Sequence, residues 1–152
     1  MLTSVPMRLC CCVALLAGFS VVGCVAQPSF TAGPVDVDAP TDFTETPSGL
    51  KYRILRKADG PKPSATDTVT VHYAGWLDDG SEFDSSYRRG KPTTFGLSQV
   101  VPGWTEGLQL VNQGGMIELE IPSFLGYGPQ GMPGAIPPNA TLHFKVELIE
   151  IR

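Results

Sequence analysis

Apolar and polar residues alternate along several segments after residue 48, and each such segment predicts a β-strand. The segments are residues 50–56, 68–76, 82–84, 117–121 and 142–148. In the second, Val69, Val71 and Tyr73 share one face, while threonine and histidine take the other. In the fourth, Glu118 and Glu120 alternate with apolar residues. The pattern therefore predicts a sheet with one apolar face and one wet face.

Helical spacing is convincing only over residues 101–112. Trp104, Leu108 and Val111 fall at i, i+4 and i+7 and form one apolar stripe. Pro102 stands where the first turn of a helix tolerates proline. One helix covers one apolar sheet face, so the predicted fold class is α+β, with a curved antiparallel sheet of four to six strands wrapped around one short helix.

The segment 122–138 is a loop of unusual composition. Of its seventeen residues, nine are glycine or proline, which excludes regular helix and central strand. Tyr127, Met132 and Ile136 lie among them. Because ordered loops with apolar contents usually cover something, we expect this segment to close over a binding surface.

The N-terminal part of the chain is predicted to lie outside the folded domain. We assign residues 1–23 to a signal peptide, 24–47 to a flexible tether and 48–152 to the domain. The apolar run 9–22 is too short for a membrane span, and either Met1 or Met7 could be the start.

The end of that apolar run, Val21-Val22-Gly23-Cys24, resembles a bacterial lipobox. Cys24 would then be lipidated, and the protein would face the periplasm from a membrane of the bacterial cell envelope. Val25 carries no acidic retention signal, which favours the outer membrane over the inner one. Cleavage after Ala26 is the alternative, and it would give a soluble secreted or periplasmic protein.

Charge and cysteine spacing exclude several function classes. The net charge is -4 with no basic cluster, so nucleic-acid binding is not expected. Cys10, Cys11 and Cys12 are consecutive and lack metal-site spacing, and we predict neither a metal nor a cofactor. His72 and His143 fall on the polar faces of strands, where solvated roles are more common than catalytic ones.

Five ordered motifs carry a family resemblance. They are Val71-His72-Tyr73-Ala74-Gly75, Phe83-Asp84-Ser85-Ser86, Val100-Val101-Pro102-Gly103-Trp104, Gly126-Tyr127-Gly128 and Ile136-Pro137-Pro138-Asn139-Ala140-Thr141-Leu142. Together they resemble the FKBP class of peptidyl-prolyl cis–trans isomerases over residues 48–152, in its bacterial exported branch. That branch often adds a helical dimerisation domain that is not seen here, so a monomer is expected.

The resemblance implies an isomerase whose substrates are proline-containing unfolded or maturing proteins, with macrolides as potential inhibitors. Trp104 would form the floor of an apolar pocket. Tyr127 would donate to the substrate carbonyl, and Asp84 would accept a polar hydrogen or orient Tyr73, with Arg89 neutralising it. The implied pocket wall is Tyr73, Phe83, Asp84, Val100, Val101, Tyr127, Ile136 and Phe144.

The chain departs from the family pattern at three positions. Thr93 and Thr94 stand where a second wall aromatic is common, and Gln99 replaces a common acidic residue. These changes bear on macrolide affinity more than on activity. The alternative function is a non-catalytic chaperone or peptide-binding module of the same fold. Taken singly, each pocket residue is better explained as ordinary core or turn, whereas the ordered set favours a pocket.

Overall fold

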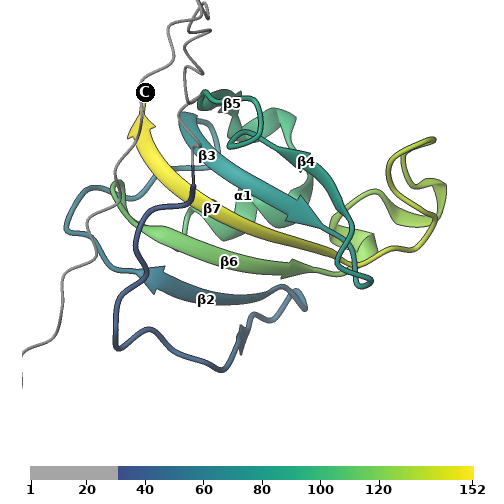
Figure 1. Cartoon of the computed structure of the whole chain (residues 1–152), viewed down its shortest axis with the longest axis horizontal. Helices are drawn as coiled ribbons and strands as arrows, with labels where there is room; N and C mark the ends of the chain where they lie inside the picture. Colours follow the sequence, from purple (N-terminus) through teal and green to yellow (C-terminus); the bar gives the residue numbers. More distant parts are fainter. Residues whose placement is uncertain (1–30) are drawn as a thin grey trace, which may run out of the picture.

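The computed structural model describes residues 31–152, and within them one antiparallel sheet curves around one short α-helix (Figure 1). This confirms the predicted fold class. The predicted signal peptide and Cys24 lie outside the described residues.

Seven strands form the sheet, in the spatial order β1-β2-β6-β7-β3-β4, with β5 paired to β3. Their bounds are β1 Thr44–Glu45, β2 Lys51–Arg56, β3 Thr68–Trp76, β4 Glu82–Ser85, β5 Thr93–Gly96, β6 Met116–Ile121 and β7 Leu142–Ile151. All pairs are antiparallel. The upper limit of six predicted strands is exceeded because β1 is only two residues long and β5 is rich in threonine, so neither shows an apolar alternation.

The predicted alternation determines which side chains enter the core. Along β3 every second residue is buried, and β7 follows the same rule over most of its length. Val69, Val71 and Val146 are fully buried, while Thr70 and His72 lie on the outward face. The sheet therefore has the apolar concave face and wet convex face that the sequence predicts.

The helix α1 spans Pro102–Leu108 and is shorter than the predicted 101–112. It ends early because the N–H groups of Gln109 and Leu110 bond three residues back, to Glu106 and Gly107. The three stripe residues are still buried, because the turn that follows keeps Val111 against the core. Within residues 31–152 there is no helix long and apolar enough to cross a membrane.

Two glycines bring α1 close to the sheet. A Cβ added at Gly103 would lie 2.5 Å from Ile121, and one at Gly107 would lie 2.7 Å from Leu119. Any larger residue would force the helix away from β6, since such distances are shorter than real carbon contacts. The helix backbone therefore rests directly on the sheet, and the larger Trp104 side chain projects beside it.

The glycine- and proline-rich loop is ordered by its own backbone hydrogen bonds. It contains two 3-10 helices, η2 Ser123–Leu125 and η3 Gly128–Gln130. Each is a single turn, so it can form even in a segment whose composition excludes a regular α-helix. Met132 and Ile136 exchange backbone bonds of 2.8 Å in each direction, and Asn139 N–H donates to Gly128. The loop projects beyond the sheet beside the C-terminal end of β3 (Figure 1).

The tether predicted over residues 24–47 needs a correction from Gly33 onward. We call residues 33–47 the N-terminal strap, because it crosses the convex face of the sheet and then follows β2 (Figure 1). Asp36 N–H donates to Leu55 at 2.8 Å, and the Arg53 guanidinium lies over the Phe43 ring. The sequence hides this docking because the contacts are polar and backbone-mediated, while Val37 faces solvent.

Candidate active site

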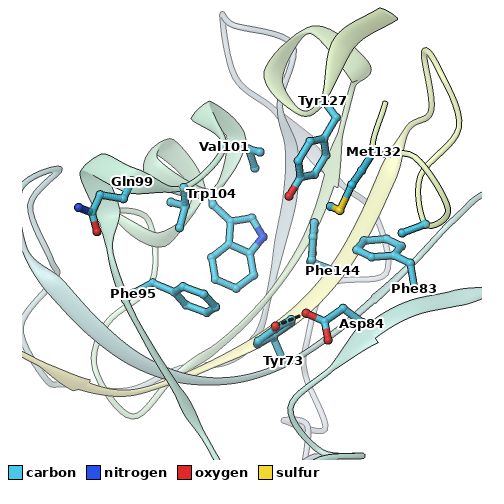
Figure 2. A pocket seen from close by; sticks show the side chains of 12 residues that line it. Tyr73, Phe83, Asp84, Phe95, Gln99, Val101, Trp104, Tyr127, Met132 and Phe144 are labelled. Atoms are coloured by element: carbon cyan, nitrogen blue, oxygen red, sulfur yellow. Dashed lines mark hydrogen bonds between the residues drawn. The ribbon is translucent and has the colours of Figure 1, made fainter. Parts of the chain in front are cut away.

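A cavity of about 590 Å³ opens between the N-terminal end of α1, the concave face of the sheet and the projecting loop (Figure 2). Its walls are mostly aromatic and aliphatic, with a few polar groups. The lining residues are Tyr73, Phe83, Asp84, Phe95, Gln99, Val100, Val101, Trp104, Tyr127, Met132, Ala135 and Phe144. A volume of this order is typical of small-molecule and peptide sites.

Eight of the nine residues that the sequence proposes for the site line this cavity: Tyr73, Phe83, Asp84, Val100, Val101, Trp104, Tyr127 and Phe144. Ile136 does not. It is 3% exposed and packs into the core beneath the loop, because its backbone is paired with Met132. Met132 and Ala135 take the wall position that the resemblance gave to Ile136.

Four lining residues were missing from the predicted site: Phe95, Gln99, Met132 and Ala135. Phe95 enters the cavity because β5 pairs with the start of β3, opposite Val69. The register of this pair is a tertiary feature, and the polar neighbours of Phe95 give no alternation that would reveal it. Met132 was absent from the proposed site residues, although it is one of the apolar side chains in the loop that the sequence predicts to cover a binding surface.

Aromatic rings in edge-to-face contact form the base of the cavity. The Trp104 ring centroid lies 5.2 Å from Tyr73, 5.4 Å from Phe95 and 5.1 Å from Phe144, with interplanar angles between 81° and 89°. This is the geometry that aromatic quadrupoles prefer. Because each ring is held by its neighbours, the floor is a rigid apolar surface.

Gly75 allows two of these rings to meet. A Cβ at this position would lie 2.7 Å from both Phe83 and Phe144. The two rings instead pack edge to face at 5.4 Å, directly over the bare backbone of β3. A glycine in the sequence motif is therefore part of the site, although it contributes no side chain.

The Trp104 indole nitrogen is a buried donor without a partner among the described residues. Trp104 is 4% exposed, and Figure 2 shows the nitrogen on the side of the ring that faces Tyr127 and Phe144. A buried polar atom of this kind is uncommon and needs an explanation. Here the donor belongs to the floor of the cavity.

One wall carries a polar cluster. The Tyr73 hydroxyl donates to Asp84, and Arg89 forms an ion pair with the same carboxylate. A second guanidinium nitrogen of Arg89 donates to the Tyr73 hydroxyl at 2.8 Å and to Thr93 Oγ1 at 3.2 Å. Ser85 N–H completes the set by donating to Asp84 at 2.8 Å. The carboxylate is thus held in place by three neighbours.

These contacts shift two pKa values in opposite directions. Burial and the hydrogen bond to Asp84 raise the pKa of Tyr73 to about 12, although Arg89 opposes the shift. Burial also raises the pKa of Asp84, but the hydrogen bonds from Tyr73 and Arg89 outweigh it, so this pKa lies below its usual value. At neutral pH the pair is therefore a neutral phenol beside an ionised carboxylate.

Tyr127 provides the polar group on the opposite side. It is 38% exposed, and its hydroxyl points down into the cavity (Figure 2). No other side chain or backbone group within residues 31–152 hydrogen-bonds to this hydroxyl. Tyr127 is the N-cap residue that precedes η3, with φ of -97° and ψ of 4°, and Gly128 follows it with a φ of 57°. The site thus presents one available hydroxyl above an aromatic floor.

Both histidines lie on the convex face, away from the cavity lining. His72 Nδ1 is 2.9 Å from Ser86 Oγ, and His143 Nε2 is 2.7 Å from Asp78. In the described part of the chain, no three His, Cys, Asp or Glu side chains gather closely enough to hold a metal ion.

Comparison with known proteins agrees with this geometry. The model of a family described as FKBP-type peptidyl-prolyl cis-trans isomerase matches residues 60–149. The chain belongs to this FKBP family. The match covers β3 to β6, α1, the projecting loop and most of β7, and it includes every residue that lines the cavity.

Two curated FKBP relatives share about half of their aligned residues with this chain. The outer membrane protein MIP of Legionella longbeachae is 52% identical over 106 residues, which are 70% of this chain and 46% of MIP. FkpA of Escherichia coli K12 is 51% identical over 105 residues, which are 69% of this chain and 38% of FkpA. The chain therefore spans less than half the length of these relatives.

Solved FKBP structures show the same fold. The crystal structure of FkpA from Escherichia coli aligns with a TM-score of 0.72 at 47% identity, covering 74% of this chain and 53% of that one. A peptidyl-prolyl cis-trans isomerase from Pseudomonas syringae pv. tomato aligns with a TM-score of 0.69 at 38% identity, covering 74% and 82%.

The Tyr73–Asp84 pair of this FKBP domain gives a titration that can be measured. We predict that the Tyr73 phenol titrates at about 12 and that Asp84→Asn lowers this midpoint toward the ordinary tyrosine value. Because the folded pKa is raised, the stability contributed by the neutral phenol is complete below about pH 10 and is lost as pH rises through the folded value. The ¹³Cζ shift of labelled tyrosines reports the midpoint, and an unchanged midpoint in Asp84→Asn contradicts the assignment.

Proposed function

We propose that this chain is a peptidyl-prolyl cis–trans isomerase that accelerates X-Pro rotation in envelope or secreted proteins. The observation that carries the proposal is the cavity itself, a rigid aromatic floor at Trp104 with the free hydroxyl of Tyr127 above it. Support comes from membership of the FKBP family and from the isomerase names of FkpA and the Pseudomonas syringae protein. The substrates would be proline-containing unfolded or maturing proteins.

The reaction needs no bond to break. Rotation about a peptide C–N bond meets a barrier of about 18–20 kcal/mol, because resonance gives the bond partial double-bond character. For X-Pro the two isomers differ by only about 0.5–1 kcal/mol, yet they exchange over tens to hundreds of seconds. A catalyst therefore has to stabilise the twisted amide relative to the planar one, and neither nucleophile nor metal is required.

We expect the cavity to provide such a difference in stabilisation. Water favours the planar, more polar amide, and the aromatic floor and walls exclude water from a prolyl ring that rests on Trp104. Tyr127 would donate a hydrogen bond to the carbonyl oxygen of the substrate. A hydrogen bond that fits the twisted carbonyl better than the planar one lowers the barrier.

Asp84 would act as an acceptor and not as a proton carrier. Its lowered pKa keeps the carboxylate ionised at neutral pH, and Tyr73 and Arg89 hold it at the cavity wall. A polar hydrogen of the substrate backbone could donate to it. Thr93 bonds to Arg89 and contributes no aromatic wall, so we expect macrolide inhibitors to bind this cavity with reduced contact area.

We further propose that the domain works at the bacterial cell envelope, anchored by a lipid at Cys24. The support is the Val21-Val22-Gly23-Cys24 sequence and the outer-membrane name of the MIP relative. The four cysteines stand at positions 10, 11, 12 and 24, so a chain cleaved before Cys24 forms no internal disulfide. Outer-membrane placement, a monomeric state and the residue 24 boundary belong to this proposal.

The isomerase proposal is tested with a protease-coupled assay of a proline tetrapeptide on the purified full chain. Removing the Tyr127 hydroxyl loses one net hydrogen bond to the substrate, so Tyr127→Phe should lower kcat/KM about three- to tenfold. Trp104→Leu should lower it at least as much, because the aromatic floor is lost. Tyr52→Phe is the matched control, since Tyr52 lies on β2 outside the cavity lining and should leave kcat/KM unchanged.

A wild-type rate equal to the uncatalysed rate would overturn the enzyme proposal. If the same chain still bound the peptide, and Tyr127→Phe weakened that binding, the function would be that of a non-catalytic peptide-binding module. Urea denaturation of each variant shows whether a loss of rate reflects the site or the fold.

The anchor is tested by cell fractionation. Cys24→Ala removes the thiol that would carry the lipid, so we expect the protein to move from the membrane to the soluble fraction. Cys12→Ala is the control, because Cys12 would be removed with the signal peptide and its loss should leave the distribution unchanged. Continued membrane association of Cys24→Ala would refute lipid anchoring, and the cleavage site after Ala26 would become the better assignment.

A further inference from the structure

The loop that joins β4 to β5 carries Arg89 and is held from the concave side of the sheet. We call residues 86–92 the pocket loop. Arg89 reaches from it to Asp84, to the Tyr73 hydroxyl at 2.8 Å and to Thr93 at 3.2 Å. These contacts place the guanidinium beside the cavity wall. They do not by themselves fix the backbone of the loop, because a long side chain can follow a moving backbone.

The same loop is also held from the convex side. The Tyr87 ring stacks on His72 with centroids 4.9 Å apart and an interplanar angle of 13°. Its hydroxyl donates to Glu147 on β7. Beside it, Ser86 is fully buried and accepts from Tyr73 N–H at 2.8 Å. The backbone of the loop is thus attached to the back of the sheet two residues before Arg89.

Glu147 joins this loop to the start of the described chain. Its side chain is only 14% exposed, although it lies on the convex face. One carboxylate oxygen accepts from Tyr87 and from Gly33 N–H at 2.7 Å, and the other pairs with Arg56 at 2.9 Å. A carboxylate that is largely removed from water depends on all its partners, since losing one leaves charge unsatisfied. The positions of Tyr87, Gly33 and Arg56 are therefore coupled through the Glu147 side chain.

The strap fits this carboxylate closely. A Cβ at Gly33 would lie 2.6 Å from Arg56 Nη1 and 2.8 Å from Glu147 Oε2. Arg56 also donates to the carbonyl of Pro34 at 3.2 Å. The N-terminal strap and the pocket loop, which are far apart in sequence, thus meet at one point on the outside of the sheet, opposite the face that α1 covers (Figure 1).

We propose that Tyr87 and Glu147 are positioning residues for the reaction, which hold Arg89 and Asp84 in place and connect the cavity to the docked N-terminal strap. Release of the strap would loosen the Glu147 cluster, then the pocket loop, and lower the rate at the cavity. The tether that leads to the proposed anchor would thereby influence catalysis. The kinetic part of this inference rests on the proposed isomerase function.

The test uses the purified full chain with two single variants and their combination. Tyr87→Phe keeps the ring stacked on His72 and removes the hydroxyl. Gly33→Ala places a Cβ against the side-chain ends of Arg56 and Glu147, so the strap and this carboxylate can no longer keep their present contact, and it changes no residue of the pocket loop. Three readouts apply: the NMR signal of Arg89 Nε, the amide hydrogen exchange of residues 84–93, and kcat/KM for the proline tetrapeptide. Tyr52→Phe is again the matched control.

We expect each single variant to shift the Arg89 Nε signal, to speed exchange in the pocket loop and to lower kcat/KM about threefold, the effect of one hydrogen bond. The double variant should be no worse than the more affected single one, because both act through Glu147. A general loss of stability would not make the effects of the two substitutions non-additive. Urea denaturation measures any such loss of stability separately.

Two results would overturn the inference. One is an unchanged Arg89 signal and unchanged loop exchange in folded Tyr87→Phe. The other is additive losses in the double variant, which would mean that strap and loop act independently. If the wild-type chain showed no isomerase activity, the proposed function would fail, whereas the Arg89 signal and the exchange rates would still decide whether the strap positions the loop.

Discussion

The edge-to-face packing of Trp104 against the rings of Tyr73, Phe95 and Phe144 is the contact on which the site depends. Gly103 and Gly107 let the helix backbone rest on β6, so the tryptophan must project beside the helix into the curve of the sheet. The rings there meet it at right angles and leave the surface above them open. The cavity forms because the rings fill the space beneath and around Trp104, while no side chain of the described residues fills the space above them.

Two polar clusters lie near this apolar floor, one on each face of the sheet. On the concave side Asp84 is held by Tyr73 and Arg89, and on the convex side Glu147 holds Tyr87. Both carboxylates are partly withdrawn from water, and in both a tyrosine hydroxyl and an arginine supply the compensating contacts. The loop between Ser86 and Pro92 runs between these two clusters, so its backbone is constrained without any regular secondary structure.

The sequence pattern predicted those strands and the helix in which buried side chains recur at regular intervals along the chain. The strands β3, β6 and β7 and the stripe through Trp104 were readable because one face of each is apolar. The strap and β5 were not, since their contacts are backbone pairs and single charged side chains that leave no pattern in sequence. Eight of the nine residues proposed from the family motifs line the cavity, whereas Ile136 lies in the core, where its backbone pairs with Met132.

We propose that an X-Pro bond rotates on the Trp104 floor beneath Tyr127. Exchange NMR of a proline tetrapeptide with a small amount of the full chain tests it directly. We expect cis–trans exchange cross-peaks together with intermolecular NOEs from the prolyl ring to the Trp104 indole. Prolyl NOEs to another surface instead, such as the hollow between Lys57, Lys62 and Leu110, would contradict it.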